Sequence, residues 1–176
     1  MGAITLPSPV LLVIAASSRY DDALDLGRQQ CEDRFGPALA VSDAFDFTET
    51  DYYAAEMGPG LKKQLWAFDL IDPARLPAVK RQTNEWEAEY ASLGRHPEPR
   101  PLNLDPGYIT LAKLVLASTK DHAHRIYLSH GIYAEVTLAY RGGGWRPFGW
   151  TYPDYRRPDY QAFFTRCREL LRSRSR

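Results

Sequence analysis

Two stretches of apolar residues at helical spacing constrain the fold of this chain more than any other feature. In the first stretch, spacings of three and four residues alternate, which places the apolar side chains on one side of a helix. These residues are Leu76, Val79, Thr83, Trp86 and Tyr90. Asp72-Pro73 is a typical helix start, because Asp accepts from the first free amides and Pro has no amide to leave unpaired. The pattern predicts a helix over residues 73–91 with Trp86 buried.

A second stripe near the end of the chain predicts a helix over residues 159–172, with Phe163 on its buried side. The stripe consists of Tyr160, Phe163, Phe164, Cys167, Leu170 and Leu171. A third helix is expected over residues 21–35, because Asp21 or Asp22 can cap its start and Gly36-Pro37 ends it.

Strand patterns precede and separate these helices. Residues 10–15 are apolar throughout and rich in branched side chains, as in a buried strand. The run is far shorter than the roughly 20 residues that cross a bilayer. A second strand is expected over residues 65–70, where alternation predicts a shared face for three side chains. They are Trp66, Phe68 and Leu70.

Residues 124–128 and 132–140 are predicted to form a hairpin around Ser129-His130-Gly131. Apolar and polar residues alternate in its second strand, so the apolar ones are expected on one face. These apolar residues are Ile132, Ala134, Val136 and Leu138.

The order of these elements predicts the fold class. Residues 38–47 are predicted to form a further strand, whereas residues 108–119 suit either a strand or a helix. Three prolines make residues 94–104 an extended connector, and residues 172–176 form a basic tail. We expect a single α+β domain over residues 1–176, with a mixed or mainly antiparallel sheet flanked by about three helices.

The composition, with 44 % hydrophobic and 25 % charged residues, is typical of a soluble globular domain. Cys31 and Cys167 lie far apart at apolar helix positions, which predicts buried free thiols and fits a reducing cytoplasm. Residues 1–9 hold no Lys or Arg and do not form a signal peptide pattern, so no membrane partner is expected. The formal net charge of zero argues against nucleic acid as the main partner, and the sequence specifies no oligomeric state.

Polar and aromatic residues are concentrated between Asp105 and Tyr155. Lys120 and Arg125 are candidate anion ligands there, because a planar guanidinium suits phosphate or carboxylate. His124 and Glu135 are the candidate catalytic residues, since burial can tune both toward neutral pH for acid–base work. The expected ligand is a small anionic molecule, phosphorylated or nucleotide-like.

Three more residues complete the candidate ligand-binding set: Tyr127, Tyr133 and Asp154. Register across the hairpin brings Tyr127 toward Tyr133. The same register brings Arg125 toward Glu135. A plainer alternative is that Arg125 and Glu135 form a cross-strand ion pair on the solvent face of the hairpin. The sequence leaves open whether the chain is an enzyme.

His122, His124 and His130 form the one cluster of metal-ligand type. On a strand, His122 and His124 would point the same way, but zinc needs further ligands. No Cys-x-x-Cys or His-Glu-x-x-His pattern supplies them, so we predict exposed loop histidines and no metal site. The Gly-x-x-x-x-Gly-Lys-Ser/Thr, Gly-x-Gly-x-x-Gly and Gly-x-Ser-x-Gly motifs are also absent from the sequence, which leaves open whether the protein uses a cofactor.

The segment Trp150–Tyr160 favours a different class of function. It holds four aromatic residues, two prolines and two arginines, and five more arginines lie between Arg166 and Arg176. Prolines stiffen the segment, so its aromatics lose little entropy on contact with a partner. The alternative to a small-molecule site is therefore a non-enzymatic module that binds protein or RNA through this segment and the basic C-terminus.

Several groups of residues form a specific set. They are Asp105-Pro106-Gly107-Tyr108, residues 113–121, His124-Arg125-Ile126-Tyr127-Leu128, residues 132–138 and residues 150–155. Together they resemble the bacterial family catalogued as domain of unknown function 4416, and the likeness covers nearly the whole chain, including Glu56-Met57-Gly58 and Asp72-Pro73. The resemblance implies one domain in a bacterial cytoplasm. It brings no activity, substrate or catalytic residue.

Overall fold

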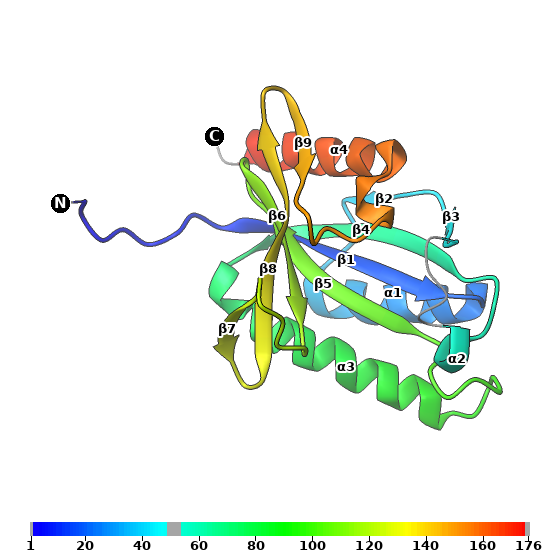
Figure 1. The fold of residues 1–176 in the computed structure, drawn as a ribbon. Helices are drawn as coiled ribbons and strands as arrows, with labels where there is room; N and C mark the ends of the chain where they lie inside the picture. Colours follow the sequence, from blue (N-terminus) through cyan, green and yellow to red (C-terminus); the bar gives the residue numbers. More distant parts are fainter. Residues whose placement is uncertain (1, 49–53, 175–176) are drawn as a thin grey trace.

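The computed structural model describes residues 2–48 and 54–174, and Figure 1 shows them as one sheet with helices on both faces. The strands are β1 (Val10–Ser18), β2 (Ala40–Val41), β3 (Phe45–Asp46), β4 (Lys62–Ile71), β5 (Asn103–Ile109), β6 (Lys113–Ser118), β7 (Ile126–Ser129), β8 (Ile132–Arg141) and β9 (Gly144–Pro147). Their order is β2-β4-β1-β5-β6-β8-β7, with β3 paired to β4 and β9 paired to β8. Each pairing is antiparallel. The predicted α+β class is confirmed.

The three predicted helices are present close to their predicted bounds. The helices are α1 (Asp21–Phe35), the short α2 (Ala54–Met57), α3 (Leu76–Ser92) and α4 (Pro158–Arg174). A 3₁₀ turn (Pro73–Arg75) leads into α3, and the Asp72 carboxylate accepts from the Ala74 amide at 2.8 Å, as expected of a cap. A second 3₁₀ turn (Asp154–Arg156) precedes α4.

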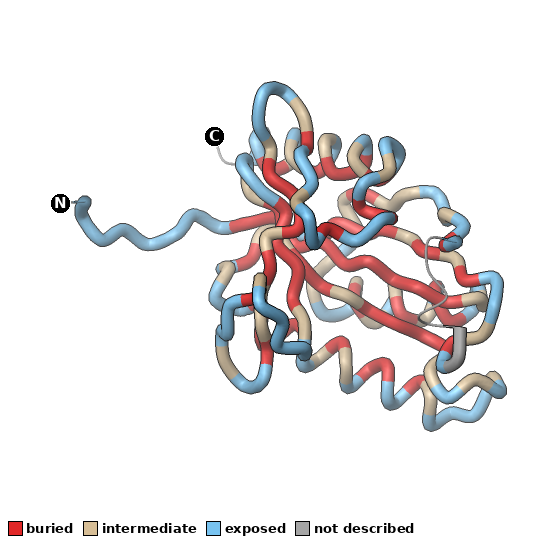
Figure 2. Tube along the Cα trace, viewed as in Figure 1, coloured by how far each residue is buried: buried red, intermediate tan, exposed pale blue. Residues whose placement is uncertain are grey.

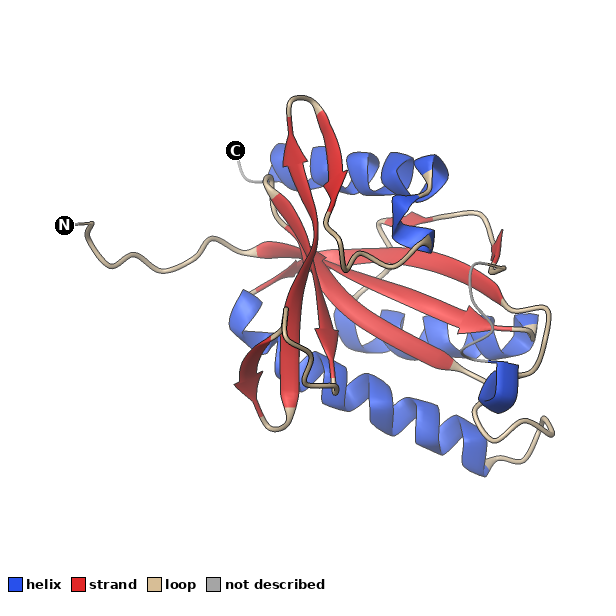
Figure 3. Cartoon of the chain, viewed as in Figure 1, coloured by secondary structure: helices blue, strands red, loops and turns tan. Residues whose placement is uncertain are grey.

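Strand β1 runs through the centre of the sheet, and its side chains alternate between two helical layers. Leu12 and Ile14 pack in one core with residues of α1 and α3, and Leu11 and Val13 pack in another with residues of α4. Figure 3 shows the helices on both sides of the strands, and Figure 2 shows burial concentrated along the central strands. Because both faces are covered, β1 is apolar at nearly every position.

The faces assigned to the helices are confirmed. Trp86 on α3 is 9 % exposed and Phe163 on α4 is 6 % exposed, and both lie in the apolar cores. Cys31 and Cys167 are buried free thiols. Burial raises the pKa of each thiol to about 12, so neither is a reactive thiolate at neutral pH.

Two strand-face predictions were wrong, and β-bulges explain both. In β4 the register with β1 shifts between Leu11 and Val13, so Leu70 packs with the α4 core while Phe68 packs with the α1 and α3 core. In β8 the register with β6 shifts between Leu114 and Val115 of β6. As a result, Leu138 packs on the opposite face of the sheet from Val136. One extra residue in a strand reverses every side chain beyond it.

The predicted connector ends earlier than expected, because β5 begins at Asn103. Asp105-Pro106-Gly107 lies within this strand and does not form a turn before it. Gly107 is required by close packing, since a Cβ there would lie 2.3 Å from the Val115 carbonyl oxygen of β6. Residues 108–119, whose sequence suited either a strand or a helix, form the end of β5 and the whole of β6.

The first residues of the predicted basic tail, 172–174, belong to a helix. Helix α4 continues to Arg174, whose guanidinium lies 2.7 Å from the Asp69 carboxylate of β4. Residues 175 and 176 of the predicted tail lie outside the described residues. Among the described helices, none has the length and apolar character needed to span a membrane.

Candidate functional site

A cavity of about 810 Å³ lies where the sheet divides between β5 and β6. The two strands pair only from Gly107 to Ile109, so Asn103 and Asp105 have no partner on β6. Pro106 has no amide to donate at this edge. Figure 1 shows β6 and β8 turning across the direction of β1, β4 and β5 at this point. The divergence of the strands produces the cavity.

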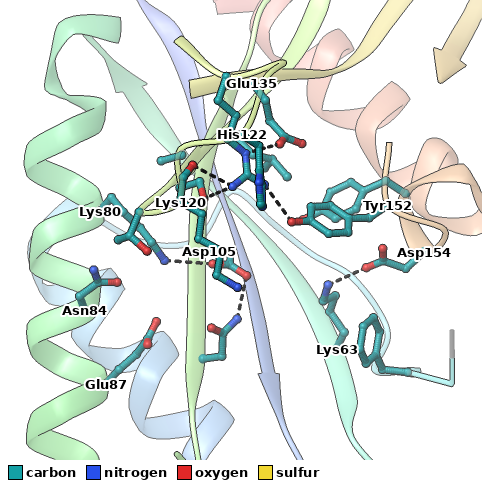
Figure 4. Close-up of a pocket in the computed structure, with 18 of the residues that line it drawn as sticks. Lys63, Lys80, Asn84, Glu87, Asp105, Lys120, His122, Glu135, Tyr152 and Asp154 are labelled. Carbon is teal, nitrogen blue, oxygen red and sulfur yellow. Dashed lines mark hydrogen bonds and ion pairs between the residues drawn. The ribbon is translucent and has the colours of Figure 1, made fainter. Parts of the chain in front are cut away.

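The described residues that line the cavity come from both halves of the sheet, from α3 and from the segment before α4 (Figure 4). They are Phe47, Lys63, Lys80, Asn84, Glu87, Arg100, Asn103, Asp105, Leu116, Ala117, Ser118, Thr119, Lys120, His122, Arg125, Glu135, Tyr152, Pro153, Asp154 and Tyr155. Five of these side chains are basic and four are acidic, so the described lining carries a small positive excess.

Lys80 and Asp105 form the first ion pair of the cavity wall. The Lys80 ammonium is buried and lies 2.9 Å from the Asp105 carboxylate, and it also donates to the Leu104 carbonyl at 3.0 Å. The Asn103 amide donates to the other oxygen of Asp105 at 2.8 Å. Burial alone would raise the pKa of Asp105, but the Lys80 and Lys63 ammonium groups lower it to about 2. Asp105 is therefore ionised at neutral pH.

Lys63 forms a second ion pair on the opposite side of the cavity. Its ammonium lies 2.6 Å from the Asp154 carboxylate, and both side chains are almost fully buried. The same nitrogen lies 4.5 Å from the centroid of the Phe47 ring and 5.2 Å from that of Tyr155, within the range of cation–π attraction. Lys63 thus connects β4 to the 3₁₀ turn before α4.

Arg100 and Glu87 form a third ion pair in the cavity wall, near α3. The Arg100 guanidinium donates to the Glu87 carboxylate at 3.0 Å, and the other Glu87 oxygen accepts from the Leu104 amide at 2.7 Å. Burial raises the pKa of Glu87, although Lys80 and Arg100 oppose the shift. This pair attaches the proline-rich connector to α3 and β5.

Arg125 is held by hydrogen bonds from each of its three nitrogens. Nε donates to the Glu135 carboxylate at 2.8 Å, and Nη2 donates to the Tyr152 hydroxyl at 2.9 Å. Nη1 donates to the Ser118 hydroxyl at 2.6 Å and to the Lys120 carbonyl at 3.0 Å. The ion pair between Arg125 and Glu135, the plainer alternative, therefore forms, but both residues are buried, so its expected place on the solvent face was wrong. The guanidinium fixes the loop from 119 to 125.

Glu135 is surrounded by donors. Besides Arg125, the Thr137 hydroxyl donates to it at 3.2 Å, and His124 Nε2 lies 3.1 Å from its Oε2. His124 does not belong to the described cavity lining. The acid–base roles of His124 and Glu135 stay predictions, because Glu135 is engaged in positioning Arg125.

The structure brings four of the seven predicted site residues to one cavity: Lys120, Arg125, Glu135 and Asp154. Tyr127 and Tyr133 face each other across the hairpin, with ring centroids 5.4 Å apart, and lie outside the described lining. Prediction missed Lys63, Lys80, Asn103 and Asp105. Lys80 did carry a signal, because it lies on the same side of α3 as Leu76 and Thr83, where an apolar residue is expected.

His122 and His124 of the predicted histidine cluster lie on the loop before β7, and His130 lies in the turn between β7 and β8. His122 and His130 are exposed as expected, whereas His124 is half-buried. The rings of His122 and His124 lie 5.9 Å apart, centroid to centroid. In residues 2–48 and 54–174, no group of three or more His, Cys, Asp and Glu side chains is arranged to hold a metal ion. The expectation of a metal-free protein stays a prediction.

The fold and the cavity define the class: a single-domain α+β protein with a cavity that is lined by ion pairs and lies at a division in its sheet. The chain belongs to the family described as domain of unknown function DUF4416, whose model matches residues 8–171. The resemblance found in the sequence is thereby confirmed. No curated protein and no solved structure matches the chain.

Proposed function

We propose that this chain binds a small anionic molecule, phosphorylated or nucleotide-like, in the cavity between β5 and β6. The observation that carries the proposal is the presence of two buried ammonium groups, Lys63 and Lys80, in the wall of a cavity of about 810 Å³. Ligand sites have volumes of roughly 300–1,000 Å³ and few, converging polar groups. The cavity is of that size and kind.

Stability alone is a poor reason for these ion pairs. Removing two charges from water costs several kcal/mol per ion, and apolar residues of similar volume often give equal or greater stability. Pockets that bind small molecules do place a few charged side chains in their walls, where these groups orient the ligand. Lys63–Asp154 and Lys80–Asp105 therefore support a binding role.

The charge of the wall favours an anion that also carries hydroxyl groups. Lys120 lies exposed at the rim and adds a positive charge that can meet phosphate or carboxylate. The Asp105 side chain is 29 % exposed, the largest exposed fraction among the ion-paired carboxylates described for the wall, and can accept from ligand hydroxyls. A sugar phosphate or a nucleotide combines both features.

The alternative function, an interaction module built on Trp150–Tyr160, has less support. Thr151, Asp154 and Tyr155 of this segment are buried. Arg156 donates to the carbonyl oxygens of Thr151 and Phe148, so one of its arginines is engaged within the chain. The main role of the segment is to hold α4 against the sheet.

We also infer a reducing, cytoplasmic setting from the two buried free thiols.

A thermal-shift screen tests the binding proposal. The probes are inorganic phosphate, pyrophosphate, sugar phosphates, nucleotides and dicarboxylic acids, each compared with KCl at equal ionic strength. We expect at least one phosphorylated probe to raise the Tm of the wild type, because ligands that bind the native state stabilise it. The shift should decrease in Lys120→Ala, which removes one exposed rim cation.

Lys113→Ala is the matched control, because Lys113 is an exposed lysine at the start of β6, whereas Lys120 follows the end of that strand, and Lys113 lies outside the described cavity lining. It should respond to each probe as the wild type does. The proposal is contradicted if no probe stabilises the wild type beyond KCl, or if both lysine variants lose the response equally.

A further inference from the structure

Four aromatic rings form a continuous stack that ends at the cavity. His122 and His124 have ring centroids 5.9 Å apart, His124 and Trp150 have centroids 5.3 Å apart, and Trp150 and Phe148 have centroids 4.8 Å apart. The interplanar angles are 21°, 12° and 1°. His122, the first ring, is also part of the cavity lining.

Hydrogen bonds position the rings of His124 and Trp150 and the backbone of Phe148. The Trp150 indole donates to the Val136 carbonyl at 3.0 Å, and His124 lies 3.1 Å from the Glu135 carboxylate. The Phe148 amide donates to the Thr151 hydroxyl at 2.8 Å, which fixes the other end. Rings that are ordered before binding lose little entropy when a further ring is added.

The loop that carries His122 also carries the rim cation. The Arg125 amide donates to the His122 carbonyl at 2.8 Å, and the Arg125 side chain donates to the Lys120 carbonyl. Arg125 therefore fixes both residues relative to the cavity, and Figure 4 shows His122 and Lys120 at the same end of it. A stacking surface and a cation lie at adjacent positions.

We infer that the ligand of the cavity is a nucleoside phosphate whose base stacks on His122 and extends this four-ring stack, while Lys120 meets its phosphate. The inference rests on the proposed binding of an anion in the cavity. A free nucleotide is favoured over RNA, because the cavity has the size of a small-molecule site and the chain has a formal net charge of zero.

Calorimetric titration with three probes tests the inference: ADP, ribose 5-phosphate and inorganic pyrophosphate. We expect the wild type to bind ADP roughly 5- to 100-fold more tightly than either probe without a base. This is the gain in affinity that stacking of one base on an aromatic ring provides. His122→Ala should remove this preference and leave pyrophosphate affinity unchanged. His122→Phe should retain it, because the ring persists.

His130→Asn is the matched control, because it removes an exposed imidazole from the adjacent hairpin turn while Asn tolerates the positive φ of 53° there. It should keep the preference for ADP. If pyrophosphate binds as tightly as ADP, the stacking inference is wrong and the anion site survives. If no probe binds, both are wrong. Tighter, His122-dependent binding of a single-stranded RNA tetranucleotide would overturn the choice of a free nucleotide.

Discussion

Lys63 and Asp154 form a buried ion pair that joins β4 to the 3₁₀ turn before α4, with 2.6 Å between Nζ and Oδ2. Asp154 belongs to the proline-containing segment Trp150–Tyr160 and to the predicted ligand-binding set, and Lys63 lies near the start of β4. The pair therefore holds the wall of the cavity and the start of α4 in one position. Its burial makes it sensitive to the loss of either partner.

Asp154→Ala should destabilise the fold by about 3–5 kcal/mol, because it leaves the Lys63 ammonium buried and unpaired. Urea denaturation measures the effect. The exposed pair of Arg174 and Asp69 provides the control, and Asp69→Ala should cost less than about 1 kcal/mol. The double variant Lys63→Met/Asp154→Leu should recover much of the loss. Equal effects of the two alanine variants would contradict the assigned burial.

Asp105 predicts a pH dependence in the acid range. Its folded-state pKa of about 2 lies below its ordinary value of 3.8, so its contribution to stability is present above about pH 3.8 and is lost as pH falls toward 2. The contribution is about 2 kcal/mol. Urea denaturation between pH 5 and pH 2 should show a shallower decline for Asp105→Asn than for the wild type. Parallel declines would show that Lys80 and Lys63 do not lower the pKa.

Trp86→Ala and Phe163→Ala should each cost about 3–5 kcal/mol, because each empties a large volume in one of the two helical layers. Thermal melts followed by circular dichroism measure this. Leu93→Ala, at an exposed position after α3, is the control and should change the Tm little. A small shift for the two core variants would contradict the packing of α3 and α4.

Arg125→Lys should loosen the loop from 119 to 125. A lysine ammonium can replace at most part of the bonds that the guanidinium makes to Glu135, Ser118 and Tyr152. We expect a loss of about 2–3 kcal/mol, typical of a buried charged network that has lost partners. Amide hydrogen exchange should rise in this loop and stay unchanged in α1. Exchange rising equally in both segments would indicate global destabilisation instead.

The helices and the hairpin could be predicted because their signals are local. The stripe from Leu76 to Tyr90 and the cap at Asp72 lie within one stretch of chain. The faces of Leu70 and Leu138 could not, because a bulge depends on the neighbouring strand as well as on the strand's own sequence. The start of β5 at Asn103 was not predicted, because Pro and Gly are unusual within a strand and Pro106-Gly107 is accommodated here where β6 departs.

Part of the candidate site could be predicted, because the signals for that part are also local in the sequence. Lys120, Arg125 and Glu135 lie close in sequence around the hairpin, so register could bring them together. Lys63, Lys80 and Asp105 come from three separate elements, and only the division of the sheet gathers them around one cavity. Only Lys80 carried a signal in the sequence, which was a charge at a helix position expected to be apolar. Lys63 and Asp105 lie outside the strands that the sequence predicted.

The most direct test of the central claim is a ¹H–¹⁵N correlation spectrum of the protein titrated with inorganic pyrophosphate. If the cavity binds anions, the largest shift changes should occur at the amides of residues 118–120 and of Lys63 and Lys80, and they should saturate together. Shift changes confined to residues 166–174 would mean that the basic C-terminal helix attracts the anion non-specifically. That result, or an unchanged spectrum, would contradict a binding site in the cavity.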